Sequence, residues 1–221
     1  MLDRYVIPII KKPLEQGARC CIQRGISANQ VTIASFAIGL LAIPALWQHY
    51  YLLALVFIVF NRIGDGLDGA IARQTQTTDA GGFLDICLDF LFYALIPLGF
   101  LLAEPEQNGL YAALLIVSFV GTGSSFLAFA SVAAKHKIDN PIYQHKSLYY
   151  MAGITEGTET IGFFIAFCLW PNAFPTLATV FAILCFMTTA NRIWAGYHTI
   201  SKSEFNDVKQ TLNKWSPDED L

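Results

Sequence analysis

The stretch DGLDGAIAR, from Asp65 to Arg73, and the stretch GGFLDICLD, from Gly81 to Asp89, lie in the most apolar part of this 221-residue chain. Together they place four aspartates among hydrocarbon side chains. An ionised carboxylate at membrane depth costs about 2.5 kcal/mol or more, even on lenient scales. The four therefore need a strongly positive partner. Mg²⁺ or Mn²⁺ is the simplest candidate, as one or two ions, because hard cations prefer carboxylate oxygens.

The composition around these stretches is that of a membrane protein with several spans. Hydrophobic residues make up 54% of the chain and charged residues 14%, and the mean hydropathy is +0.46. Such values are typical of polytopic membrane proteins. We do not expect the N-terminal segment MLDRYVIPIIKKPLEQ to be a cleavable signal, because charges interrupt it before an apolar core can form.

We predict an all-α fold with six membrane-spanning helices, each near the ~20 residues that a bilayer requires. They cover roughly residues 29–47, 52–73, 82–102, 110–134, 149–170 and 176–197. The connections at 48–51, 103–109 and 171–175 contain no Lys or Arg. The positive-inside rule therefore predicts a multi-pass protein of the inner (plasma) membrane, with both termini and the active site on the cytoplasmic side.

The remaining segments are more polar. Residues 1–28 mix apolar and basic side chains, which predicts an amphipathic helix at the membrane interface, although Pro8 and Pro13 disturb its regularity. Residues 201–221 are charged and are expected to form a cytoplasmic tail. No repeat or linker divides the chain, so we predict a single membrane domain over residues 1–221.

Helical spacing places the aspartates in two groups. Asp65 and Asp68 share a face of their helix with Gly69 and Ala72, and Asp85 and Asp89 are one turn apart on the next helix. A tight turn over residues 74–80 would make the two pairs face each other. Small residues beside them would leave room for a ligand. The alternative is that the aspartates form buried ion pairs with arginines. The candidate arginines are Arg62, Arg73 and Arg192.

The run Asp65-Gly-Leu-Asp68-Gly-Ala-Ile-Ala-Arg73, a short spacer, and Gly-(x)3-Asp85-(x)3-Asp89 resemble the signature of the CDP-alcohol phosphotransferase family. The resemblance implies an enzyme of phospholipid biosynthesis. It would move a phosphatidyl or related phosphoryl group from a CDP-linked lipid, such as CDP-diacylglycerol, to an alcohol and release CMP. It also implies a homodimer among membrane lipids; no nucleic-acid partner is expected.

The resemblance also assigns roles to residues. Asp65, Asp68 and Asp85 match the metal-binding carboxylates. Asp89 matches the fourth aspartate, which the resemblance implies is both a metal-binding residue and the base for the acceptor hydroxyl. The positions that match the lining of the CDP donor site are Asp65, Gly69, Ala72 and Arg73. The spacer before the next glycine has seven residues where the family usually has eight, which leaves open whether Gly81 or Gly82 is the motif glycine.

The segment Ser27-Ala-Asn29-Gln-Val-Thr32 resembles the Pro-Asn-x-x-Thr entry to the first helix of the family. Asn29 and Thr32 are therefore candidates for the donor site, with helix capping as the alternative. Three further polar residues, Glu156, Glu159 and Arg192, could shape an acceptor pocket or form a structural ion pair.

Two other functions use intramembrane aspartates. A cation transporter often shows internal repeats and interrupted helices in both halves, and no repeat is present here. A prenyltransferase usually has two similar Asp-rich motifs far apart, whereas here Asp68 and Asp85 are separated by 16 residues. Only the transferase would release CMP. The sequence does not identify the acceptor alcohol.

Overall fold

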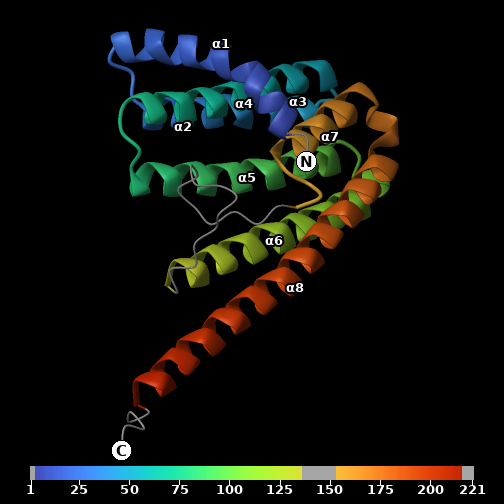
Figure 1. Ribbon diagram of the computed structural model, residues 1–221. Helices are drawn as coiled ribbons and strands as arrows, with labels where there is room; N and C mark the ends of the chain where they lie inside the picture. The colour runs from blue at the N-terminus through green and yellow to red at the C-terminus, as the bar shows by residue number, and fades with distance from the viewer. Residues whose placement is uncertain (1–2, 136–152, 216–221) are drawn as a thin grey trace, which may run out of the picture.

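The computed structural model describes residues 3–135 and 153–215, and this part of the chain contains helices and no strand (Figure 1). The all-α prediction is confirmed. The helices are α1 (Asp3–Gln23), α2 (Ala28–Leu40), α3 (Ala42–Trp47), α4 (Tyr51–Gln74), α5 (Asp79–Ala103), α6 (Pro105–Lys135), α7 (Gly157–Leu169), the 3-10 turn η1 (Pro171–Ala173) and α8 (Phe174–Trp215).

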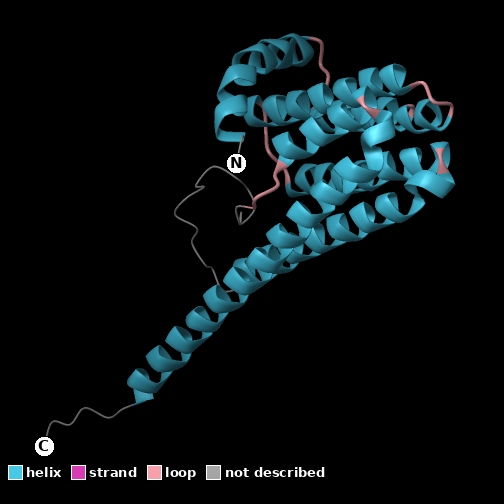
Figure 2. Cartoon of the chain, turned by 90° about the vertical axis from the view of Figure 1, so that its right-hand side faces the viewer, coloured by secondary structure: helices cyan, strands magenta, loops and turns pink. Residues whose placement is uncertain are grey.

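The helices form layers. α1 packs over α4, α2 packs against both α4 and α5, and α6 lies between α5 and α8 (Figure 1). α8 runs along α6 and then projects beyond all the other helices (Figure 2). Four segments are long and apolar enough to cross a membrane: Ala28–Trp47, Asp79–Ala103, Pro105–Lys135 and Pro171–Lys202. α4 is also long, but its second half carries the charged residues of the motif.

Two predicted spans differ from the structure. The first is divided at Leu41, because Pro44 has no N–H to donate to the carbonyl of Leu40. The fifth begins at Gly157 rather than at residue 149; residues 149–152 lie outside the described part. Glu156 ends the preceding segment as a helix cap, and its backbone N–H donates to Glu159 Oε2 at 3.1 Å.

The beginning of α5 and the end of α8 also differ from the predicted boundaries. α5 begins at Asp79, because Thr78 Oγ1 accepts the backbone N–H of Gly81 at 3.1 Å and caps the helix. The connection from α4 to α5 is thus shorter than predicted. α8 continues to Trp215, well into the segment predicted as a tail. No Pro or Gly occurs between residues 199 and 215, so nothing in the sequence ends the helix earlier.

An aromatic core occupies the half of the bundle away from the motif. The rings of Phe100 and Phe174 stack with centroids 4.5 Å apart, and those of Phe163 and Phe181 stack at 4.3 Å.

Glycines allow the helices nearer the motif to approach closely. A Cβ at Gly64 of α4 would overlap Ser35 of α2, so these two helices cross with their backbones almost in contact.

This crossing gives a stability prediction. Gly64→Ala should lower the midpoint of thermal unfolding, since overpacking costs about 1–3 kcal/mol. Gly162→Ala in α7 is the matched control, because a Cβ there meets no atom within 4 Å and alanine is the better helix former by about 1 kcal/mol. Fluorescence-detected size exclusion of heated, detergent-solubilised protein measures both midpoints. Equal midpoints for the two variants would contradict the close crossing.

Candidate metal and donor site

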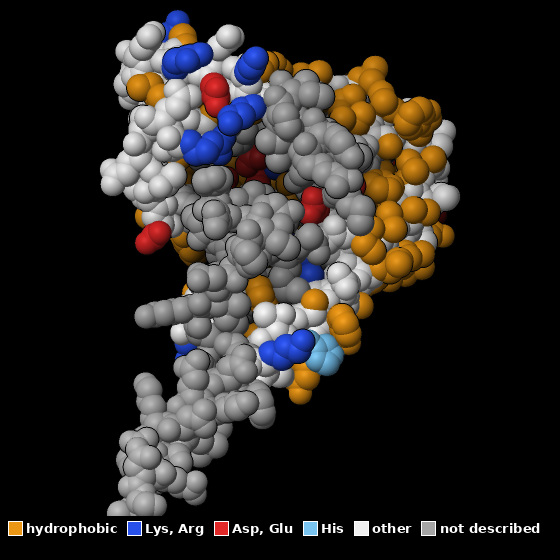
Figure 3. Space-filling model, viewed as in Figure 1, with side chains coloured by type: hydrophobic (Ala, Val, Ile, Leu, Met, Phe, Trp, Pro, Cys, Tyr) orange, Lys and Arg blue, Asp and Glu red, His pale blue; other side chains and the backbone are white. Residues whose placement is uncertain are grey.

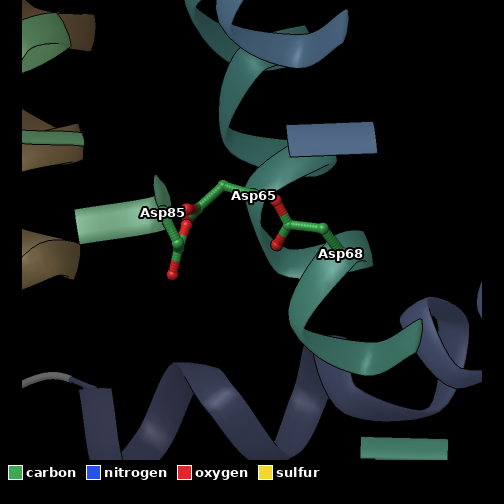
Figure 4. Close-up of side chains that lie close together, drawn as sticks. All are labelled: Asp65, Asp68 and Asp85. Atoms are coloured by element: carbon green, nitrogen blue, oxygen red, sulfur yellow. The ribbon is translucent and has the colours of Figure 1, made fainter. Parts of the chain in front are cut away.

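Three of the motif aspartates meet between α4 and α5. Asp65, Asp68 and Asp85 each offer a carboxylate oxygen, and the three oxygens lie within 4.8 Å of one another. Figure 4 shows Asp85 reaching from α5 toward the two aspartates of α4. The short capped connection between the helices brings the carboxylates together, so the predicted facing of the two acidic groups is confirmed for these three residues.

The carboxylates line a partly open pocket between α2, α4 and α5, whose empty space of about 200 Å³ includes open solvent. The lining residues are Thr32, Ser35, Phe36, Asn61, Arg62, Asp65, Asp68, Asp85, Leu88 and Asp89. In the space-filling view, acidic side chains lie recessed in a hollow, and several basic side chains group beside it (Figure 3).

The three carboxylates suit a divalent cation. Asp68 is only 4% exposed, and its Oδ2 is a buried atom with no hydrogen-bond partner among the described residues. Leaving such an oxygen unsatisfied costs about 1–3 kcal/mol, and more when it is charged. A set of carboxylate oxygens is the kind that Mg²⁺ and Mn²⁺ prefer. Asp65, Asp68 and Asp85 would therefore hold the ion.

Asp89 lines the same pocket, and its carboxylate lies within hydrogen-bonding reach of Asp65. Arg62 Nη2 donates to Asp89 Oδ1 at 2.8 Å, and Arg62 Nη1 lies 3.7 Å from Asp65 Oδ2. Of the candidate arginines, Arg62 therefore pairs with aspartates of the motif, as the ion-pair alternative predicts. Arg192 instead donates from Nη1 to the carbonyl of Thr122 at 3.1 Å.

The three residues expected to line the donor, Gly69, Ala72 and Arg73, follow the acidic face toward the end of α4. A Cβ at Gly69 would lie 3.1 Å from Arg73 Nη1, so the guanidinium group occupies the space that the missing side chain leaves. Arg73 is exposed and Ala72 is half-buried. A cationic group therefore lies one helical turn beyond Asp68.

At the start of α2, capping is performed by Ser27. Its Oγ accepts the backbone N–H of Gln30, and its own N–H donates to Gln30 Oε1 at 2.9 Å. Asn29 and Thr32 are therefore free of the N-cap role. Thr32 is buried in the pocket wall, with its hydroxyl donating to the carbonyl of Ala28 at 3.1 Å, and Asn29 is exposed.

The two candidate motif glycines differ in their surroundings. A Cβ at Gly81 would come within 3.0 Å of both Asn29 Oδ1 and Thr78 Oγ1, whereas a Cβ at Gly82 would meet nothing within 4 Å. Of these two positions, only Gly81 is so close to neighbouring atoms that a larger residue would crowd them. This contact favours Gly81 as the motif glycine and brings Asn29 of α2 to the beginning of α5.

Several pocket residues were not singled out from the sequence as site residues. Asn61 and Arg62 stand four and three positions before Asp65, and two polar residues in an apolar run were the available signal. Ser35 belongs to no recognisable sequence motif. Phe36 and Leu88 are apolar, so the sequence does not distinguish them from the other apolar residues of the membrane helices.

Comparisons with known proteins identify the family of this chain. The family model described as CDP-alcohol phosphatidyltransferase matches residues 26–200. Inner membrane protein YnjF of Escherichia coli K12 is 58% identical over 200 residues, which cover 90% of this chain and 97% of that protein. Archaetidylinositol phosphate synthase of Pyrococcus horikoshii is 39% identical over 93 residues, which cover 42% of this chain and 50% of that one.

Solved structures match the fold. The phosphatidylinositol phosphate synthase of Mycobacterium tuberculosis with CDP-DAG bound aligns with a TM-score of 0.61 at 18% identity, over 85% of this chain and 92% of that one. The same enzyme in complex with manganese and citrate aligns with a TM-score of 0.61 at 19% identity, over 85% and 88%. The family match and the 58% identity to an inner membrane protein, together with the apolar helices, support a membrane location and favour the transferase over the transporter and prenyltransferase alternatives.

The carboxylate group predicts metal binding. Asp68→Asn and Asp85→Asn should each weaken Mn²⁺ binding by about 10-fold or more, because each removes a charged oxygen ligand. Asp79→Asn is the control, since this exposed aspartate at the beginning of α5 is outside the group. Titration of purified protein with Mn²⁺, followed by electron paramagnetic resonance, measures the affinities. Unchanged affinity in both site variants would contradict the assignment.

Proposed function

Because this chain belongs to the CDP-alcohol phosphatidyltransferase family, whose members are transferases, we propose that it transfers the phosphatidyl group of CDP-diacylglycerol to an alcohol and releases CMP. The observation that carries the proposal is the convergence of Asp65, Asp68 and Asp85 within 4.8 Å in a pocket. A pyrophosphate donor brings negative charge, and a cation held by these carboxylates would neutralise it.

The choice of donor is supported by the solved relative with CDP-DAG bound. Both the archaeal relative and the mycobacterial structures are named as synthases of inositol phosphate lipids. The chain also carries basic residues after α6, at Lys137 and Lys146, which lie outside the described residues. These features favour a phosphorylated alcohol as the first acceptor to test.

Different residues of the chain have different roles in the proposed reaction. When bound, a divalent ion would neutralise pyrophosphate oxygens and stabilise the leaving CMP. Asp65, Asp68 and Asp85 would hold that divalent ion, and Arg73 would place a second positive group beside the donor. Asp89 accepts the proton of the acceptor hydroxyl. The acceptor oxygen then forms the new bond to the phosphatidyl phosphorus as the bond from phosphorus to CMP breaks.

The arrangement in the membrane is proposed from the fold. α2–α3, α4, α5, α6, α7 and α8 would form six spans, with both termini and the pocket on the cytoplasmic side of the inner membrane. α1 would lie at the interface as part of the same single domain. Its Leu14 and Ala18 pack against Ala70 and Ile71 of α4, directly behind the acidic face. The turns at the opposite end of the bundle are the ones without Lys or Arg.

Two glycines of α6, Gly121 and Gly123, do not mark the interface of the proposed homodimer. A Cβ at Gly121 would lie 3.1 Å from Thr189 of α8, and one at Gly123 would lie 2.8 Å from Phe90 of α5. These glycines therefore serve packing within one subunit.

The first test is the reaction itself. Purified protein with CDP-diacylglycerol should release CMP only when a suitable alcohol is added, and a panel of glycerol 3-phosphate, inositol phosphate and serine should reveal the acceptor. Excess EDTA should abolish release, and Mg²⁺ or Mn²⁺ should restore it, because the carboxylate group needs a hard cation. Undiminished CMP release in EDTA would rule out the metal.

A second test separates Asp89 from the metal ligands. Asp89→Asn keeps the size of the side chain but cannot take a proton at neutral pH, so turnover should fall by about 10²-fold or more while donor affinity survives. Asp79→Asn again serves as the control. The measurements are CMP release and CDP-diacylglycerol affinity for each variant. Near-normal turnover, or loss of donor binding, would show that Asp89 is not primarily the base.

A further inference from the structure

Arg62 is the one basic side chain among the described residues that line the acidic pocket. It lies in the middle of α4 and is only 7% exposed. Its Nη2 donates to Asp89 Oδ1 at 2.8 Å, and its Nη1 lies 3.7 Å from Asp65 Oδ2. One guanidinium group therefore lies beside two of the four motif aspartates.

These two aspartates are also close to each other. The carboxylates of Asp65 and Asp89 lie within hydrogen-bonding reach, although the residues belong to different helices. Two ionised carboxylates at such a distance repel each other strongly in apolar surroundings, unless a positive group lies next to both. Arg62 is a positive group in that position.

The guanidinium group is held there by neutral residues. Nη1 donates to the hydroxyl of Tyr93 at 3.1 Å, and Nε donates to Asn61 Oδ1 at 2.8 Å. Asn61 in turn donates from Nδ2 to the carbonyl of Ser35 on α2 at 3.0 Å. The guanidinium carbon also lies 4.9 Å from the ring centroid of Phe92, a contact that stabilises a buried cation. Residues of α2, α4 and α5 thus fix the positive charge in the pocket.

The other two aspartates have no such partner. Neither Asp68 nor Asp85 forms an ion pair with a described residue, and Asp68 Oδ2 has no hydrogen-bond partner in that part of the chain. The protein itself therefore supplies positive charge only to Asp65 and Asp89. Asp68 and Asp85 depend on a bound cation for theirs.

We propose that Arg62 is a built-in counter-cation of the acidic pocket, which keeps Asp65 and Asp89 side by side and joins α5 to α4 when no divalent ion is bound. A bound divalent ion adds positive charge to the same carboxylates. The contributions of Arg62 and of the ion to stability therefore overlap. The inference concerns the assembly of the pocket and does not rest on the proposed reaction.

The test is the midpoint of thermal unfolding of detergent-solubilised Arg62→Gln, measured in EDTA and in Mn²⁺. In EDTA the midpoint should fall by about 6 °C or more, because Asp65 and Asp89 lose their shared positive partner. The same Mn²⁺ concentration should then raise the midpoint of the variant more than that of the wild type, which by linkage means tighter Mn²⁺ binding. An equal Mn²⁺ shift in the two proteins would indicate a packing role alone and would overturn the proposal.

Two control variants separate charge from packing. Arg62→Lys keeps the positive charge but not the planar group, so its Mn²⁺ shift should stay at the wild-type value even if its midpoint in EDTA is lower. Arg24→Gln removes an exposed positive charge just beyond α1, outside the pocket, and should leave the Mn²⁺ shift unchanged. A shift as large as that of Arg62→Gln in either control would overturn the proposal.

A double variant tests the pairing directly. Arg62→Gln combined with Asp89→Asn removes one charge of each sign, so its midpoint in EDTA should exceed that of Arg62→Gln alone. A further fall would overturn the proposal. If Arg62→Gln does not fold, a folded double variant supports the proposal and an unfolded one overturns it. None of these measurements needs turnover, so a protein that releases no CMP would refute the proposed function and leave the role of Arg62 decided.

Discussion

The mutual repulsion of carboxylates in apolar surroundings is the constraint on which this structure depends. Asp65, Asp68 and Asp85 bring three negative charges within 4.8 Å, and a buried oxygen of Asp68 has no partner among the described residues. Coulomb repulsion at such distances is several kcal/mol per pair at an effective dielectric constant near 20. A divalent cation bound by the group would relieve this repulsion, and it would also receive the negative charge of the donor.

The surrounding helices are built to keep that group in place. Backbone contact at Gly64 fixes α2 against α4, and close approach at Gly81 fixes the beginning of α5 against Asn29 of α2. α1 supports the opposite face of α4, where Gln74 Nε2 donates to the carbonyl of Glu15 at 3.2 Å. The aromatic core at the other half of the bundle provides rigidity by apolar packing and leaves the acidic half open to ligands.

The sequence could predict what depends on local periodicity. Spacings of three and four residues placed Asp65 with Asp68 and put Asp85 one turn from Asp89, and apolar length located most spans. Contacts between residues far apart in the chain could not be predicted from the sequence. The pairing of Arg62 with Asp89 joins residues 27 positions apart. The late beginning of α7 depends on Thr188 of α8, whose hydroxyl accepts the backbone N–H groups of Ile154 and Thr155 at 3.1 Å.

The central claim is that Asp65, Asp68 and Asp85 together hold a divalent cation. The most direct measurement is anomalous diffraction from crystals of the protein grown with Mn²⁺. The account predicts an anomalous peak between these three carboxylates, within coordination distance of an oxygen of each. A site without a peak, or an ion bound by Asp89 in place of one of the three, would contradict it.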